Sequence, residues 1–452
     1  MKRLLFPLLA LIALATAFSS CQNSVRLDLS RRIDLLIKDT SLYNHIWLDY
    51  DGISLYKSKA HKELDKPECK IYYDEIETFN GMWELYDTKE MVQFYKEKGN
   101  VLFDVELMEK VRNQLQVREE GSPEKPLAGK LIAVDPAHIG GTPQMAELEG
   151  KLLKIVKAPQ DTVYIDEGAL TLAVARILEV KLEKLGASVI LTRRKPGNSA
   201  FEKTFFEWMR EDFEREVKRD RYIKEITEET AAYLLAEAST EYIYNQYFLK
   251  KEMNRRVKII NDYSPDLALI VEFNIHEPNW KKRDAQGALR PTDKNYSLTF
   301  VPGGFMRGEL HTPEQRLELL RLITTNHLDE SIKLSDKVLT AFQYELGVTP
   351  VKPGNSLNYL EKSCNPTDKK GVYARNLSIT RRVHAPLCYG LPLCLDNVEE
   401  FEELTKAEAQ VGDDIVTSLR IEEVADAYVA ALQQHFQVEA PLTEEDVVEE
   451  EI

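Results

Sequence analysis

The chain has 452 residues, of which 43% are hydrophobic, and carries a formal net charge of −16. This length exceeds the usual size of one domain and predicts a large domain with a smaller partner. The acidic charge argues against nucleic acid as a partner, because a protein that follows phosphates needs a basic face. Part of the charge lies in residues 438–452, which we expect to form a disordered, solvated tail.

Residues 1–21 have the features of an export signal. Lys2 and Arg3 supply a charged start, and Leu4–Phe18 is an apolar run too short for a membrane-spanning helix. The small residues directly before Cys21 resemble the lipobox of bacterial lipoproteins. They imply cleavage before Cys21, a lipid on its sulfur, and a cell-envelope location, either periplasmic or anchored at the outer membrane. The alternative is a plain secretory signal in which Cys21 has no role.

The remaining cysteines lie in a protein for which we expect export, so disulfides are chemically allowed. Their spacing fits neither a paired zinc knuckle nor a CxxC redox motif. Cys388 and Cys394 lie in an apolar segment, where we expect small buried side chains; a bridge between the two is the alternative. The cysteines concerned are Cys69, Cys364, Cys388 and Cys394.

Residues 23–120 are predicted to form a separate, small α+β region at the N-terminus. Asp51-Gly52 lies between two apolar runs and indicates a hairpin turn. Aromatic residues are frequent here, and such rings stack on sugars, so the region could bind glycan. A place in the hydrophobic core is the more common role of such rings. They are Tyr43, Trp47, Tyr50, Tyr56, Tyr72, Tyr73, Trp83 and Tyr86.

Strand and helix patterns alternate over residues 128–437, which predicts an α/β domain with a mixed, mostly parallel sheet flanked by helices. Leu131–Asp135 is a short apolar run typical of a buried strand, and Glu167–Lys184 has apolar residues at helical spacing. Ser188–Thr192 is the next strand, completing the strand–helix–strand unit of a parallel sheet. Charged and aromatic residues over about 198–251 predict inserted helices that form a lid or wall over a cleft.

The second half of this domain is predicted to alternate in the same way. One strand, Asp266–His276, has Glu272, Asn274 and His276 on one face. A polar face that ends in a histidine is unusual for a purely structural strand. The other predicted strands are Tyr296–Val301 and Leu387–Leu395, and the predicted helices are Glu252–Asp262, Asp329–Leu346 and Ile421–His435.

Short motifs mark the ends of these elements. Ile132–Gly141 (IAVDPAHIGG) is similar to a strand followed by Asp-Pro-Gly-His-Gly-Gly, and Leu185–Arg193 to a Gly-x-x-Val-x-x-Thr-Arg strand. Arg255–Asn261 and Asn274–His276 are similar to Arg-x-x-x-Ala-Asn and Ser-Ile-His segments. In this order the motifs resemble the zinc-dependent N-acetylmuramoyl-L-alanine amidases of the Amidase_3 family. The resemblance covers residues 130–404 and implies cleavage of the amide between muramic acid and the stem peptide of peptidoglycan.

The resemblance implies a zinc ion bound by His138, Glu167 and His276. Two neutral imidazoles and one carboxylate leave positive charge on the metal, which lowers the pKa of a bound water. Asp135 is expected either to hold the turn at the strand end or to orient His138. The resemblance also implies peptidoglycan or muropeptides as partners, and a regulatory protein partner is a further expectation.

The sequence departs mildly from the family at Ala137, in place of a glycine, and at Asn274, in place of a serine, and more strongly in two other places. An insertion, Thr142–Ile165, separates the first histidine from the glutamate. The family's last strand carries a glutamate thought to act as general base, but Tyr389, Gly390 or Leu391 takes that place here. Loss of a general base costs roughly 10²–10⁴-fold in rate. The alternative function is therefore an inactive, amidase-like protein that binds peptidoglycan or a partner enzyme.

Two residues are candidates to replace the missing base. Glu272 lies on the same predicted strand face as His276 and could reach a metal-bound water. The alternative for Glu272 is a buried carboxylate paired with Arg193 or Arg256. His384 could serve as acid, base or an extra ligand.

Overall fold

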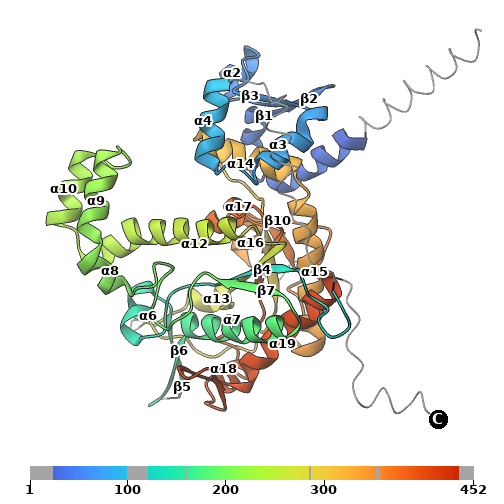
Figure 1. Cartoon of the computed structure of the whole chain (residues 1–452). Helices are drawn as coiled ribbons and strands as arrows, with labels where there is room; N and C mark the ends of the chain where they lie inside the picture. Colours follow the sequence, from blue (N-terminus) through green and yellow to red (C-terminus); the bar gives the residue numbers. More distant parts are fainter. Residues whose placement is uncertain (1–23, 99–120, 159, 285–286, 353–356, 437–452) are drawn as a thin grey trace, which may run out of the picture.

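The computed structural model describes residues 24–98, 121–158, 160–284, 287–352 and 357–436 (Figure 1). The predictions for the export signal, the lipidation of Cys21 and the acidic tail therefore fall outside the described residues. Among the described helices, none combines the length and apolar character needed to cross a bilayer.

A seven-stranded sheet forms the centre of the fold, in the order β10-β11-β9-β12-β8-β4-β7. β4 pairs in parallel with β7 and β8, and β8 pairs in parallel with β12, whereas β9 is antiparallel to β12. The predicted α/β class with a mixed, mostly parallel sheet is confirmed. The strands are β4 Leu131–Pro136, β7 Ser188–Leu191, β8 Leu267–Val271, β9 Leu298–Val301, β10 Asn365–Pro366, β11 Val372–Ala374 and β12 Leu387–Leu391.

Helices cover both faces of this sheet. α7 (Glu167–Lys184), α15 (His327–Glu345) and α19 (Leu419–His435) pack on one face, against alternate apolar residues such as Val134 and Leu269. α12 (Leu249–Tyr263) and α17 (Ser378–Arg382) cover the other face, where small residues such as Ala133 and Ala268 let the helices approach closely. The alternation along each strand thus produces three layers.

Two of the predicted strands end earlier than the sequence indicated. Val271 pairs with Pro136 and with Gly390, and the ladder stops there because β4 leaves the sheet after Pro136. The strand predicted over Asp266–His276 is β8 in the structure, and β8 has only five residues, Leu267–Val271. β12 ends at Leu391, directly before a proline that cannot donate to a ladder.

The N-terminal region begins with a helix over residues 24–36 and contains a three-stranded antiparallel sheet. β1 and β2 form the hairpin expected around Asp51-Gly52. The region is not isolated: it packs against α14 (Pro313–Thr324), and Arg316 of α14 forms an ion pair with Glu68 at 2.5 Å. Its elements are η1 Thr40–His45, β1 Ile46–Leu48, β2 Gly52–Leu55, α2 Lys59–Glu63, β3 Cys69–Tyr72, η2 Tyr73–Glu75, α3 Ile76–Met82 and α4 Thr88–Lys98.

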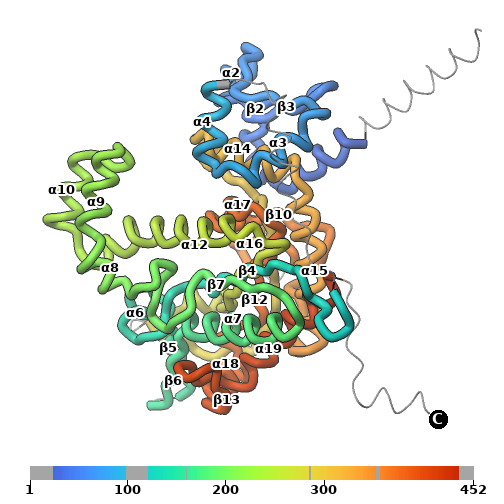
Figure 2. The backbone as a smooth tube through the Cα atoms, viewed as in Figure 1, coloured from blue at the N-terminus to red at the C-terminus, as the bar shows by residue number. Residues whose placement is uncertain are grey.

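The expected helical insertion extends from the end of α12 away from the sheet (Figure 2). Its aromatic core, in which Phe205, Trp208 and Phe248 are buried against one another, also includes Ile139 and Met145 from outside the insertion. Its elements are α8 Phe205–Glu211, α9 Phe213–Tyr222, α10 Glu228–Ala236, α11 Thr240–Tyr242 and the π-helix η3 Ile243–Phe248.

The insertion between the first histidine and the glutamate forms a short helix and a hairpin: α6 (Pro143–Glu149), β5 (Leu152–Ala158) and β6 (Asp161–Asp166). β6 leads directly into α7, so the hairpin lies beside the edge of the sheet where β4 and β8 end. The remaining elements are α13 Glu277–Trp280, α16 Asn358–Ser363, α18 Glu400–Leu404, β13 Ala409–Val411 and β14 Ile415–Thr417. All four described cysteines are free and buried, as expected for Cys388 and Cys394.

Candidate metal centre

Three side chains with metal-ligating atoms meet at the carboxyl edge of the sheet. His138, Glu167 and Glu272 each offer one atom, and these atoms all lie within 4.8 Å of one another. His138 Nε2 is 2.9 Å from Glu272 Oε1 and 3.7 Å from Glu167 Oε1. The topology explains the meeting: Pro136 and Val271 are register partners at the ends of β4 and β8, so the residues that follow them emerge side by side.

A close backbone approach fixes Glu167 beside His138. A Cβ atom on Gly168 would lie 2.7 Å from the Cα of Gly140, a distance that side chains do not tolerate. Only two glycines permit this contact between the loop after β4 and the first turn of α7. The Asp166 carboxylate accepts hydrogen bonds from both segments and caps α7.

The backbone of His138 is itself constrained. Its φ of +65° is unusual for a non-glycine residue, and such conformations persist where surrounding contacts hold them. The guanidinium of Arg256 donates to the carbonyl oxygens of His138 (2.8 Å) and Pro136 (2.7 Å). It also pairs with the buried Asp135 and Glu252. Asp135 therefore acts at the strand end, through Arg256, and not on the histidine ring.

The His138 ring is oriented by a carboxylate that the sequence analysis did not identify. Glu149, the last residue of α6, lies 3.3 Å from His138 Nδ1 and also accepts from the backbone N–H of Ile139. A carboxylate on the far nitrogen is the usual support of a metal-binding histidine. Burial lowers the pKa of His138, but the charge of Glu167 and the hydrogen bonds with Glu149 and Glu272 raise it to about 9.

Lys151 and Tyr389 complete the surroundings of the carboxylates. Lys151 Nζ lies 3.1 Å from Glu167 Oε2 and 3.6 Å from Glu272 Oε1. The Tyr389 hydroxyl, on β12, donates to Glu272 Oε2. Burial raises the pKa of Glu272, but His138, Lys151 and Tyr389 outweigh this effect and hold the pKa well below its usual range.

His276 does not join this group. It lies four residues beyond Glu272, where the chain has left β8, and its backbone N–H donates to Asp396. Its ring nitrogen Nδ1 is 3.4 Å from the Tyr296 hydroxyl. The place predicted for His276 is taken by Glu272, because β8 ends at Val271. Strand length was the available clue, since strands of five or six residues are typical and the predicted one had eleven.

The partners proposed for Glu272 are also different from those observed. Arg193 donates to backbone carbonyls, among them that of Gly168, and Arg256 pairs with Asp135 and Glu252. Glu272 is nevertheless a paired, largely buried carboxylate, with His138 and Lys151 as its charged partners. His384 lies elsewhere, 3.5 Å from Glu318 and against the ring of Trp83.

The donor set suits a metal ion. A tetrahedral ion with bonds of about 2.0–2.1 Å places its ligand atoms roughly 3.3 Å apart. The His138 contacts of 2.9 Å with Glu272 and 3.7 Å with Glu167 lie on either side of this value. With Glu149 orienting the imidazole, His138, Glu167 and Glu272 could hold a metal with small movements of their side chains.

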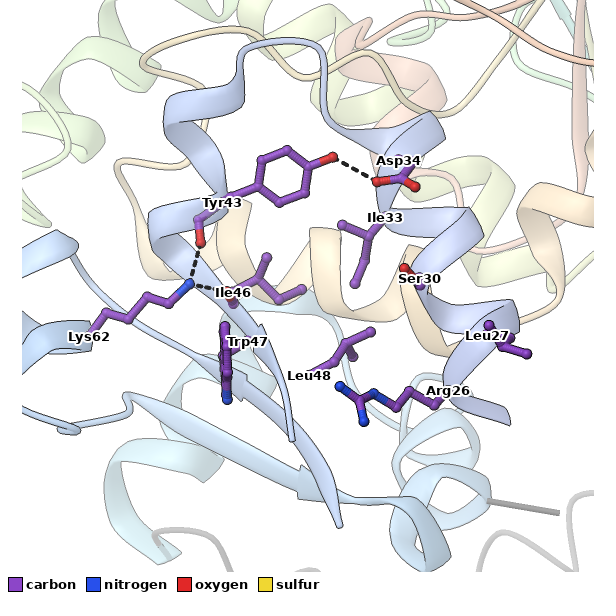
Figure 3. A pocket seen from close by; sticks show the side chains of 10 residues that line it. All are labelled: Arg26, Leu27, Ser30, Ile33, Asp34, Tyr43, Ile46, Trp47, Leu48 and Lys62. Atoms are coloured by element: carbon purple, nitrogen blue, oxygen red, sulfur yellow. Dashed lines mark hydrogen bonds between the residues drawn. The ribbon is translucent and has the colours of Figure 1, made fainter. Parts of the chain in front are cut away.

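A hollow of about 750 Å³ lies in the N-terminal region, apart from the candidate metal centre (Figure 3). Trp47 lines it with 52% of its surface exposed, and Lys62 Nζ lies 4.9 Å from that ring. Tyr56 and Trp83 are buried, so the core interpretation is correct for them, whereas the glycan interpretation stays a prediction for the exposed rings. The residues that line the hollow are Arg26, Leu27, Ser30, Ile33, Asp34, Tyr43, Ile46, Trp47, Leu48 and Lys62.

No family model matches the sequence, and no curated protein matches it. Among solved structures, the chain is similar to the CwlD amidase from Clostridioides difficile, determined in complex with the GerS lipoprotein. The identity is 15%, over 69% of this chain and 100% of that one, with a TM-score of 0.35. It is also similar to the N-acetylmuramyl-L-alanine amidase Ami1 from Mycobacterium abscessus, with 12% identity over 68% of this chain and 99% of that one and a TM-score of 0.35. The catalytic domain of CwlV, an N-acetylmuramoyl-L-alanine amidase from Bacillus (Paenibacillus) polymyxa var. colistinus, gives 12% identity over 69% and 99%, with a TM-score of 0.33.

Proposed function

We propose that this protein is a zinc-dependent N-acetylmuramoyl-L-alanine amidase that acts on peptidoglycan. The observation that supports the proposal is the meeting of His138, Glu167 and Glu272, with Glu149 on the far side of the imidazole. Zinc is the metal that the sequence resemblance implies, and an imidazole with two carboxylates is an acceptable donor set for it. The resemblance likewise supplies the substrate, the amide between muramic acid and the stem peptide.

In this proposal each residue has a defined task. A zinc ion, when bound, would polarise the amide carbonyl and lower the pKa of a water. With zinc bound, Glu149 would keep the proton of the neutral His138 ring on Nδ1, which leaves Nε2 free to bind the metal. Tyr389 fixes Glu272 by donating to its second oxygen.

A second candidate function is binding without turnover, to peptidoglycan or to a partner protein. One observation favours it: Glu272, the candidate base, is part of the ligand group, and Tyr389 contacts it from the last strand, where the family has its glutamate. Glu149, the other nearby carboxylate, is occupied by His138 and by the backbone N–H of Ile139. The site as described thus has no unengaged carboxylate to accept a proton from water.

Release of stem peptide from purified peptidoglycan separates the two candidates. We would assay the chain lacking residues 1–21 with added zinc, beside His138→Ala and, as a control outside the site, His61→Ala. Release that survives in the control and disappears in His138→Ala supports the amidase. Zinc binding and sedimentation with peptidoglycan, in the absence of release, would reject the amidase and support the binding protein.

We also propose that the protein is exported and tethered to a membrane of the cell envelope by a lipid on Cys21. The support is the sequence before Cys21, which resembles a lipobox. A single lipid chain gives only marginal binding, so a stable anchor requires more than one. Metabolic labelling with palmitate should mark the wild-type protein and not Cys21→Ser. Equal labelling of both would reject the anchor while leaving export open.

A further inference from the structure

Lys151 is the one lysine whose ammonium lies within 4 Å of the carboxylates of the candidate metal centre, among the described residues. It comes from the insertion between His138 and Glu167, at the start of the hairpin that this insertion forms. The Lys151 carbonyl accepts from the backbone N–H of Glu167, at 3.3 Å. The lysine backbone is thereby fixed to the residue whose side chain its ammonium contacts.

The ammonium and a metal ion would share the same partners. Glu167 presents Oε1 to His138 and Oε2 to Lys151, and Glu272 Oε1 lies close to both. Two largely buried carboxylates at such short range repel each other unless a cation lies between them. The His138 ring contacts both carboxylates, and the Lys151 ammonium adds a second positive group beside them.

We propose that Lys151 is a built-in counter-cation of this centre, which holds Glu167 and Glu272 together in the metal-free protein and competes with a metal for them. The inference rests on the metal site of the proposed function, but it does not require turnover. A divalent ion bound to the two carboxylates would lie beside the ammonium, and the like charges repel. Metal binding therefore requires the Lys151 side chain to move away.

The side chain has room to make this movement. A quarter of the Lys151 side chain is exposed to solvent, whereas only 1% of the Glu167 side chain is exposed. The four-carbon stem of lysine can rotate while the backbone stays in the hairpin. The ammonium is thus the partly exposed group on a flexible stem, whereas the Glu167 carboxylate is buried, so zinc occupancy should depend on Lys151.

The test is zinc titration by calorimetry, together with thermal unfolding in EDTA, on the chain lacking residues 1–21. In Lys151→Met we expect zinc affinity to rise at least about tenfold and the melting temperature in EDTA to fall, because the carboxylates lose their counter-cation. Lys151→Arg keeps the charge and should bind zinc as weakly as wild type. Lys157→Met, on the same hairpin but paired with Glu402 at the surface, is the control.

The outcomes separate this inference from the proposed function. Equal or weaker zinc binding in Lys151→Met than in wild type would overturn the inference, while zinc binding by wild type would keep the proposed function. Zinc binding by Lys151→Met but not by wild type would support the inference and reject a zinc enzyme. No zinc binding by either chain would overturn both.

Discussion

Replacement of Arg256 by methionine should be among the most destabilising single changes in this fold. The guanidinium is 3% exposed and pairs with Asp135 at 3.0 Å and with Glu252 at 2.9 Å. It also donates to the carbonyl oxygens of Pro136 and His138. Methionine fills a similar volume but removes the guanidinium from two buried carboxylates and its donated hydrogen bonds from two carbonyls, of which that of Pro136 also accepts from Arg193.

The magnitude follows from the geometry. Removing one partner of a buried ion pair costs about 3–5 kcal/mol, because the other charge stays buried and uncompensated. We therefore expect Arg256→Met to lower the free energy of unfolding by about 4 kcal/mol. For a chain of 452 residues, an unfolding entropy of about 2.1 cal/mol/K per residue converts this loss into a fall in melting temperature of roughly 4–5 °C. Arg256→Lys keeps the charge but not the planar fork of the guanidinium, so its melting temperature should lie between those of wild type and Arg256→Met.

Thermal unfolding followed by circular dichroism, in EDTA, measures the effect without a contribution from metal. Lys258→Met is the matched control: it lies on the same helix, and its pair with Asp262 is well exposed. An exposed pair contributes about 0–1 kcal/mol, so the control should unfold close to wild type. A melting temperature of Arg256→Met within 2 °C of wild type would refute this account of the network.

Three further predictions concern other parts of the fold. Gly168→Ala should destabilise the protein by about 3 kcal/mol in urea unfolding and weaken zinc binding, although alanine is the better helix former, because its Cβ would meet Gly140. Gly150→Ala, at φ +71° with open space around it, should cost only about 1 kcal/mol; equal losses in the two variants would contradict the close approach. Tyr389→Phe removes the hydroxyl that donates to Glu272 and should lower stability by about 1–3 kcal/mol in the same assay, while an unchanged value would mean that this contact is absent in solution. Finally, burial, Arg321 and His384 lower the pKa of His327 to about 3. The folded ring therefore stays neutral where the unfolded one, with a pKa near 6.5, takes up a proton, and stability should fall by about 1–2 kcal/mol from pH 6.5 to pH 5. His327→Asn, which keeps an acceptor for Arg321, should lose this part of the pH dependence in urea unfolding at the two pH values, and an unchanged slope would exclude His327 as its source.

The parts of the fold predicted correctly are those whose cause is local. Glu167–Lys184 was predicted from its apolar spacing, and the helix has these bounds. Leu131–Asp135 was predicted as a strand from its apolar run, and β4 has the same start and extends one residue further, to Pro136. Patterns of this kind are set by the period of the element itself.

The length of β8 could not be predicted in the same way, because it depends on its neighbours. The alternation of polar and apolar residues continues to His276, but the pairing with β4 stops at Pro136. The sequence analysis therefore placed the candidate ligand that follows this strand at His276, four positions beyond Glu272, which lies in the group near His138. Comparing the expected length of Asp266–His276 with that of Leu131–Asp135 would have pointed to residue 272.

Glu149 and Lys151 could not be recognised because their roles depend on contacts made by an insertion. This insertion appeared in the sequence as an interruption between His138 and Glu167, with no motif of its own. In the structure it places a carboxylate on one side of His138 and an ammonium on the carboxylates at the other side. The segment that makes this chain depart from the amidase pattern thus supplies the charges that balance the centre. For this reason, the chemistry of the site should be tested first at Lys151 and Glu149 and only afterwards at the residues that follow the family pattern.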